Sequence, residues 1–363
     1  FSYKKDNPSR ADLSCIIKNK YGKVEMSTSF SSNHNFSKGF FYVADGTFNF
    51  YDTEKKTAYQ DCYASLNAGK TLGIGNYDSA NIIHSNGKFY LLVGTSTSNR
   101  DHFYIVDAKT LYYENSAVVG ANLSGLTILN EQYGLVTGDG IRRIDLKSLN
   151  NVRIKNERLL CFYNSIIYNG KVLSNDTYKD ESKVKYYDVN ELIAAKEGEA
   201  PAVTELDIIQ KQKINFVLAK DGNVYTLESA DNGCNIVKIK NDFTLEKVFA
   251  NFQPAKGPYH SSPTIGMVAS ETENIIYLVS TDGAIYKYIL GDSDSLKAPF
   301  IAAESGVSIT APLQLNQQSG ELYVTYTEER KDESKIVVYS KDGKVLHTVD
   351  CGESVPSQIL FNN

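Results

Sequence analysis

A tight-turn glycine recurs between short apolar runs along this chain, and it constrains the fold more than any other feature. The turns are Asp45-Gly46, Asn86-Gly87, Asp139-Gly140, Asn169-Gly170, Asp221-Gly222, Asp282-Gly283, Ser319-Gly320 and Asp342-Gly343. Asn-Gly and Asp-Gly supply the positive φ angles that a two-residue hairpin needs, so each turn predicts antiparallel strands rather than a helix. Their recurrence predicts a repeated all-β unit.

The second apolar run of each unit shows the repeat most clearly. It occurs seven times, and in five of the seven a tyrosine takes the same place, at Tyr42, Tyr90, Tyr225, Tyr277 and Tyr323. The runs recur at intervals of about 47 residues, a length typical of a four-stranded propeller blade. The sequence therefore predicts an all-β fold, a seven-bladed β-propeller of four-stranded antiparallel blades over residues 38–363, with six or eight blades as alternatives.

The two ends of the chain indicate how the ring closes. Blade 1 has no obvious innermost strand before Phe40, whereas 357–361, after blade 7, matches the innermost strand of the other blades. We expect this C-terminal strand to pair into blade 1 and close the ring, which removes the exposed edges of an open array. Residues 1–37 are a separate N-terminal segment, in which the runs at 15–17 and 24–26 predict an extra hairpin or the remnant of an eighth blade.

An Asp residue ends the third strand of blades 1 to 4, at Asp52, Asp107, Asp145 and Asp188. Asp closes turns by accepting hydrogen bonds from nearby backbone amides, so we interpret these carboxylates as structural rather than catalytic. Asp188 also opens a capping-box pattern with Glu191, ahead of residues that favour helix. The sequence predicts one short helix at this place.

Composition excludes several classes of protein. A net charge of −5 without a basic block argues against a nucleic-acid partner. No run approaches the length of apolar residues that a transmembrane helix needs. The five cysteines, Cys15, Cys62, Cys161, Cys234 and Cys351, are scattered singly, so we expect buried small residues rather than a metal or redox motif, with any pairing left open. The abrupt start at Phe1 is consistent with a targeting segment that has been removed.

The predicted loops point to one end of the propeller as the binding face. Connections between the second and third strands are long in four blades, and they lie at the same end as the connections between blades. Long loops on a rigid scaffold commonly carry function. Polar and aromatic side chains near the mouth of the central channel are candidates to bind a small polar ligand. These candidates are Tyr77, Asn122, Tyr163, Asn164, Lys213, Tyr259, His260 and Thr310.

No motif of a known active site is present. The chain has no G-x-S-x-G elbow, and its five histidines have no metal-binding spacing. The acidic turn 291–294 lacks the remaining oxygen ligands of a calcium loop, so we interpret it as a solvated turn. We therefore predict no catalytic residue, no metal ligand and no cofactor.

Blades 1 and 2 resemble a known family. The segments 46–52, 67–73, 82–83, 86–90 and 105–111 are similar to the YncE-like (YVTN-type) propellers of Bacteroidetes cell-envelope lipoproteins. The resemblance implies a seven-bladed, exported binding protein in the periplasm or at the outer-membrane surface, anchored by a lipid on a Cys upstream of Phe1. Many such proteins are thought to work beside outer-membrane nutrient uptake systems. Related quinoproteins use Trp-bearing docking motifs, and the absence of Trp here counts against a quinone cofactor.

Two functions follow from these observations. The first is a non-catalytic, monomeric envelope propeller that binds a small polar ligand, a glycan or an outer-membrane partner protein on its long-loop face. The alternative is a propeller enzyme such as a lactonase-like hydrolase, which by resemblance would hold a channel metal with Glu, Asp and Asn. The inter-blade loops offer Asp78, Asn122 and Asn164 but no clear Glu, so the binding protein is favoured.

Overall fold

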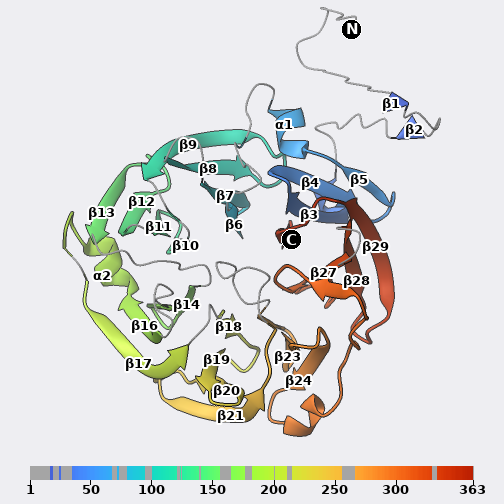
Figure 1. The fold of residues 1–363 in the computed structure, drawn as a ribbon. Coiled ribbons are helices and arrows are strands. Elements are labelled where there is room, and N and C mark those ends of the chain that lie inside the picture. Colours follow the sequence, from blue (N-terminus) through green and yellow to red (C-terminus); the bar gives the residue numbers. More distant parts are fainter. Residues whose placement is uncertain are drawn as a thin grey trace, which may run out of the picture.

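The computed structural model places seven antiparallel sheets around a ring (Figure 1). It describes residues 17–18, 24–25, 35–67, 72, 80–94, 100–120, 123, 125–138, 140–155, 165–175, 182–199, 201–210, 215–255, 266–328 and 333–362. Each sheet is a blade, and its strands follow one another from the centre of the ring outward. The seven-bladed propeller that the sequence predicted is confirmed.

Blades 1 to 4 each contain four strands, which are named below from the inside outward. Blade 1 contains β30 (Gln358–Leu360), β3 (Gly39–Ala44), β4 (Thr47–Asp52) and β5 (Thr57–Tyr59). Blade 2 contains β6 (Ala80–Ser85), β7 (Lys88–Val93), β8 (Asp101–Asp107) and β9 (Tyr113–Gly120). Blade 3 contains β10 (Gly125–Ile128), β11 (Tyr133–Thr137), β12 (Ile141–Asp145) and β13 (Asn151–Lys155). Blade 4 contains β14 (Ile166–Tyr168), β15 (Lys171–Asn175), β16 (Ser182–Asp188) and β17 (Val203–Gln210).

Blades 6 and 7 depart from the four-strand plan that blade 5 still follows. Blade 5 contains β18 (Val217–Leu218), β19 (Val224–Ala230), β20 (Gly233–Ile239) and β21 (Leu245–Phe252). Within the described ranges, blade 6 contains only β22 (Met267–Ala269), β23 (Ile275–Val279) and β24 (Ile285–Ile289). Blade 7 has a divided inner strand, β25 (Val307–Ile309) and β26 (Gln314–Leu315), on β27 (Leu322–Glu328), followed by β28 (Glu333–Tyr339) and β29 (Val345–Gly352).

The C-terminal strand closes the ring as expected. β30 pairs antiparallel with β3, with Phe41 opposite Leu360 and Tyr42 opposite Ile359. Blade 1 is therefore built from both ends of the described ring. In the N-terminal segment, β1 (Ile17–Lys18) and β2 (Val24–Glu25) pair antiparallel. The division of the chain at residue 37 stays a prediction.

The hairpin turns have the backbone geometry that their sequences require. Asn86 and Gly87 have φ angles of 51° and 69°, and Asn169 and Gly170 have φ angles of 47° and 71°. Two consecutive residues with positive φ match the right-handed twist of the flanking strands. The Asn-Gly pairs therefore form the first turns of blades 2 and 4.

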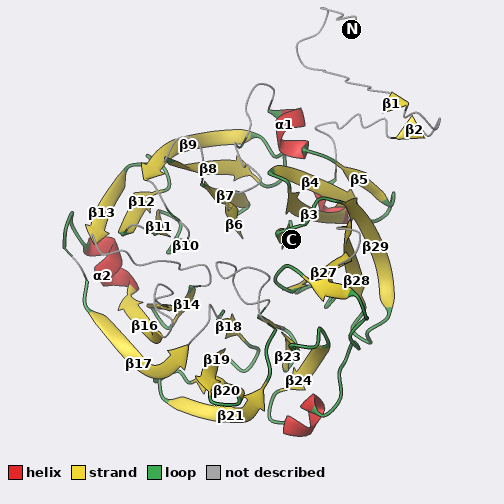
Figure 2. Ribbon diagram, in the orientation of Figure 1, coloured by secondary structure: helices red, strands yellow, loops and turns green. Residues whose placement is uncertain are grey.

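The aspartates at the ends of the third strands are structural, as interpreted from the sequence. Asp107 accepts hydrogen bonds from the Thr110 amide and hydroxyl, each at 2.7 Å. Asp188 accepts from the amides of Asn190 and Glu191 and so caps helix α2 (Val189–Ala194). The predicted helix is confirmed. Figure 2 shows α2 at the rim of the ring between β13 and β16, and α1 (Cys62–Leu66) at the outer edge of the ring near β4. Short 3₁₀ turns occur at η1 (Phe36–Lys38) and η2 (Ser293–Leu296).

Apolar side chains fill the spaces between neighbouring blades. Phe41 and Phe89, from blades 1 and 2, meet edge to face with ring centroids 5.3 Å apart. Such contacts favour the packing of sheet on sheet beyond the apolar area that they bury. Cys62 and Cys234 are buried free thiols, and Cys351 is a half-buried one. No helix in the described ranges is long and apolar enough to cross a membrane.

Candidate functional site

Most of the predicted ligand-binding residues lie outside the described residues. These are Tyr77, Asn122, Tyr163, Asn164, Lys213, Tyr259 and His260, together with Asp78 of the hydrolase alternative. Thr310 is described and lies just after β25, where its hydroxyl is 3.0 Å from the Thr327 hydroxyl. Thr327 is in turn 3.0 Å from the Ser334 hydroxyl. Thr310 thus belongs to a row of hydroxyl groups across blade 7, and its role in binding stays a prediction.

A buried row of polar side chains joins blades 4 to 6 at the end of the propeller where one blade connects to the next. In blade 5 the prediction of a long loop between the second and third strands is wrong, because β19 continues to Ala230 and pairs there with Gly233 of β20, which leaves a two-residue turn. Asn175 donates to Gln210 at 2.7 Å, and Gln210 donates to the Thr226 hydroxyl at 2.9 Å. The Thr226 hydroxyl donates to the carbonyl of Asn215 at 3.1 Å. The Asn215 side chain then bonds both the amide and the carbonyl of Met267 in blade 6. Because these groups are satisfied by one another, they hold three blades in register.

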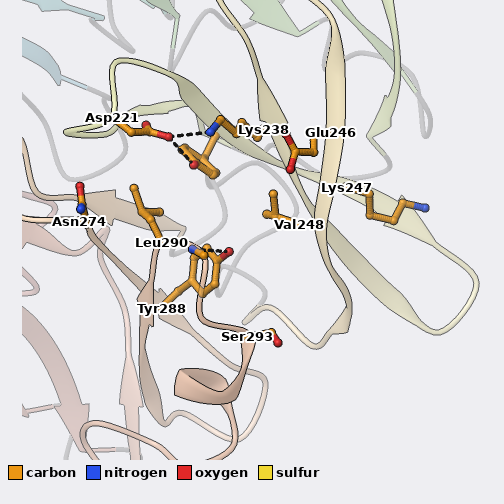
Figure 3. A pocket seen from close by; sticks show the side chains of 11 residues that line it. Asp221, Lys238, Glu246, Lys247, Val248, Asn274, Tyr288, Leu290 and Ser293 are labelled. Atoms are coloured by element: carbon orange, nitrogen blue, oxygen red, sulfur yellow. Dashed lines mark hydrogen bonds and ion pairs between the residues drawn. The ribbon is translucent and has the colours of Figure 1, made fainter.

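A polar cleft of about 470 Å³ opens between blades 5 and 6 (Figure 3). Its volume lies within the range of small-molecule sites. It is lined by Asp221, Tyr225, Lys238, Glu246, Lys247, Val248, Asn274, Tyr288, Leu290, Gly291 and Ser293. Asp221 lies in the turn before β19 and Asn274 in the turn before β23. These turns are at the end of the propeller opposite to the predicted long-loop face.

The missing outer strand of blade 6 explains why the cleft is at this place. Beyond β24, pairing within the described residues is limited to isolated bridges, Ile285 with Ile301 and Ile289 with Asp292. The chain turns at Gly291, whose φ is 85°, and enters η2, and it returns to β24 only at Phe300 and Ile301, which bond to Ile285. The facing side of β21 in blade 5 therefore lacks the strand that would otherwise cover it. The cleft occupies this space.

Asp221, Lys238 and Tyr225 form one connected group on the blade 5 side of the cleft. The Lys238 ammonium is 2.8 Å from the Asp221 carboxylate, and the Tyr225 hydroxyl donates to the same carboxylate at 2.8 Å. Partial burial opposes ionisation of Asp221, but the hydrogen bonds from Lys238, Tyr225 and Asn223 together outweigh it and lower the pKa of Asp221. Burial, followed by the hydrogen bond to Asp221, raises the pKa of Tyr225. Asp221 is therefore a carboxylate and Tyr225 a neutral phenol at neutral pH.

The other charged side chains of the cleft are paired as well. Glu246 is 2.9 Å from Lys240, and Lys247 is 3.6 Å from Glu228. Lys240 also lowers the pKa of Glu246. The cleft is thus polar and electrically balanced, with both hydrogen-bond donors and acceptors on its walls.

The sequence contained no direct signal for this cleft. Asp221 was recognised only as part of a turn, and Tyr225 only as a member of the repeated tyrosines. The one available clue was the segment 290–301, which does not follow the pattern of a fourth strand in blade 6. Among the described residues, no group of three or more His, Cys, Asp or Glu side chains is arranged to hold a metal ion.

The fold defines the class of protein as a seven-bladed β-propeller with a quinoprotein-like fold. The chain belongs to the family described as Domain of unknown function (DUF5074), whose model matches residues 36–362. None of the proteins with curated functions matches it significantly.

The solved structures that are similar to this chain include the following two. The first is a quinoprotein alcohol dehydrogenase-like protein from Bacteroides thetaiotaomicron, with 99% identity over 100% of this chain and 87% of that chain, and a TM-score of 0.90. The second is the dihydro-heme d1 dehydrogenase NirN, with 12% identity over 91% of this chain and 76% of that chain, and a TM-score of 0.55. The second likeness shows the fold alone.

The cleft does not favour an anionic quinone cofactor, which the name of the first relative raises. The carboxylates of such a cofactor would need charge-assisted hydrogen bonds from cationic side chains, and a net positive charge on the walls would have to balance them. The two lysines of the cleft, Lys238 and Lys247, each already contact a carboxylate. We derive no chemistry through such a group.

Proposed function

We propose that this protein is a non-catalytic propeller that binds a small polar ligand or a glycan. The cleft between blades 5 and 6 carries the proposal, because it combines a suitable volume with polar walls and the partly apolar floor of Val248 and Leu290. The rigid ring supports such a role, since a preformed site costs little ordering on binding. The long-loop face, with its candidate residues, remains a second predicted surface for a ligand or a partner protein.

The ionisation states in the cleft favour binding over catalysis. A general acid or base works best when its pKa is near the working pH. In this cleft the pKa of Asp221 is lowered and that of Tyr225 is raised, so both move away from neutrality. Neither group is tuned to transfer a proton to or from a substrate.

The cellular part of the proposal is an exported protein, anchored by a lipid in the envelope and associated with nutrient uptake. It rests on the resemblance of blades 1 and 2 to YncE-like propellers and on the likeness to a Bacteroides protein. The test is fractionation of cells that express the full-length gene, with and without the cysteine expected upstream of Phe1. The protein should be in the membrane fraction and should leave it when that cysteine is replaced. If the cysteine variant stays in the membrane fraction, the lipid anchor is contradicted. It is also contradicted if the protein that keeps the cysteine is already released from the membrane.

Thermal unfolding against a panel of ligands tests the binding function. The panel contains divalent metals, neutral sugars, a corrinoid and haem. A ligand that binds only the native state adds about 2.7 kcal/mol of stability at a concentration of 100 times its Kd. The protein should respond to an organic ligand, and Val248→Arg, which fills the cleft, should remove the response. Val203→Arg places the same charge on the exposed outer strand of blade 4 and should leave the response unchanged.

The other outcomes of this panel separate the alternatives. A response to divalent metal alone would favour the hydrolase. A response that survives Val248→Arg would assign the ligand to another surface, such as the long-loop face. No response to any compound would contradict a small-ligand function and favour a protein partner.

A further inference from the structure

We infer that the cleft between blades 5 and 6 selects an uncharged, multiply hydroxylated ligand, a neutral sugar unit, and that Asn274 and Ser293 determine this specificity. The inference rests on the proposed function and names the ligand class of that same site. It follows from the charge balance of the walls, from the side chains that still have hydrogen-bonding capacity, and from the apolar floor.

The charge balance is the first step of the argument. The cleft is lined by two carboxylates and two ammonium groups, Asp221, Glu246, Lys238 and Lys247. Each of the four has an opposite charge within 4.0 Å. A charged ligand would meet no uncompensated charge of the opposite sign, and it would lose hydration on entry. The walls therefore favour a ligand without a net charge.

The remaining hydrogen-bonding capacity is the second step. Asn274 and Ser293 are exposed at the cleft, and their side chains have no hydrogen-bond partner among the described residues. Figure 3 labels both on the blade 6 side, across from Lys238 and Glu246. An amide and a hydroxyl each donate and accept, as does every hydroxyl of a sugar. The Tyr225 hydroxyl donates its proton to Asp221, whereas the Tyr288 hydroxyl accepts from the Gly291 amide and keeps its own proton to donate.

The paired charges and the floor complete the recognition. The Asp221 and Lys238 side chains are 25% and 22% exposed, so each can contact a ligand without losing its partner. A sugar hydroxyl can donate to the carboxylate and accept from the ammonium at the same time. Val248 and Leu290 are half-buried and offer an apolar surface to the C–H groups of a sugar ring. These features suit a neutral sugar better than an acidic or a basic one.

Titration calorimetry with two sets of matched sugars tests the inference. Each set contains a neutral sugar, its uronic acid and its 2-amino form: galactose, galacturonic acid and galactosamine, and the three glucose counterparts. In at least one set we expect the neutral sugar to bind roughly fivefold more tightly than both charged forms, a ratio equivalent to about 1 kcal/mol. Asn274→Ala and Ser293→Ala should each weaken binding of the neutral sugar.

Charge-changing variants give the sharpest result. Asp221→Asn removes the carboxylate that Lys238 contacts at 2.8 Å and one negative charge from the cleft, so the preference should shift towards the uronic acid. Lys238→Met leaves Asp221 unpaired and should shift the preference towards the amino sugar. Asp207→Asn removes the carboxylate that faces Lys183 in blade 4, at 3.6 Å, and serves as the matched control without a shift. Circular dichroism and thermal unfolding establish that each variant is folded before its binding is compared.

The contrary outcomes separate this inference from the proposed function. Tighter binding of a charged sugar to the unaltered protein would overturn the inference and leave the binding function intact. Sugar binding that survives Val248→Arg, or that ignores both charge variants, would place the sugar elsewhere and overturn the inference. Binding of a corrinoid or haem but of no sugar would also overturn it, whereas binding of nothing in the ligand panel would overturn the proposed function itself.

Discussion

Replacing Gln358 by Ala removes two hydrogen bonds with which the C-terminal strand holds blade 2. The Gln358 side chain donates to the carbonyl of Ile82 at 2.7 Å and accepts from the amide of Ile82 at 3.3 Å. In Gln358→Ala, both backbone groups of Ile82 lose their partner. A buried polar group left unsatisfied costs about 1–3 kcal/mol, and Gln358 is only half-buried, so water replaces part of the loss. We expect the free energy of unfolding to fall by about 2 kcal/mol.

Urea denaturation measures this loss, with an unchanged m value as the sign that the unfolded surface is the same. Gln318→Ala is the matched control, because Gln318 is exposed on blade 7 and its side chain makes no hydrogen bond among the described residues. Hydrogen exchange at the Ile82 amide should be faster in Gln358→Ala. A loss of stability no larger than that of Gln318→Ala, with unchanged exchange at Ile82, would refute the reasoning and mean that water satisfies Ile82 fully.

Three further predictions test the packing and the pH response of the ring. Gly39→Ala should cost several times more stability than Gly198→Ala in urea denaturation. A Cβ at Gly39 would lie 1.9 Å from the Tyr51 carbonyl oxygen. At Gly198 a Cβ adds only the strain of a φ of 75°, about 1–2 kcal/mol. Equal losses would contradict the close approach of β3 and β4 at Gly39. Leu135→Ala should cost about 2–5 kcal/mol in the same assay, because Leu135 is 1% exposed between blades 3 and 4, and a loss below 1 kcal/mol would contradict that burial. Burial lowers the pKa of His84 below 6.5. The contribution of His84 to stability is therefore complete above pH 6.5 and is lost as the pH falls through the lowered pKa. Thermal unfolding of His84→Phe should be less sensitive to pH in that window, and an unchanged sensitivity would refute the role of His84.

The blade count and the turn positions could be predicted from the sequence because they depend on local chemistry. Asn86-Gly87 and Asn169-Gly170 need positive φ angles, and those angles require a hairpin whatever surrounds it. The carboxylates of Asp107 and Asp188 bond to amides only two or three residues away, so their structural role is also visible locally. The closing strand could be found because blade 1 lacked a strand that every other blade had.

The cleft could not be predicted in this way, because it depends on which surface is left uncovered. Lys238 of β20 and Asn274 before β23 lie on neighbouring blades, and only the packing of blade 5 on blade 6 brings them to one space. The side of β21 that faces blade 6 is open at the cleft in the structure. Its exposure follows from the path of the chain after Gly291, which enters η2 and forms no fourth strand of blade 6 within the described ranges.

The sequence by itself therefore determined the repeated unit, its turns and the closure of the ring. The unit and its turns are set by residues close in the chain, and the closure is set by the number of strand-like segments in each repeat. Only the tertiary structure decided where a polar cleft opens and which charges balance one another within it. The pairing of Asp221 with Lys238 at 2.8 Å depends on the register of two strands, and its meeting with Asn274 depends on how two sheets pack. Register and packing are properties of the whole ring, because many weak contacts between blades fix them together.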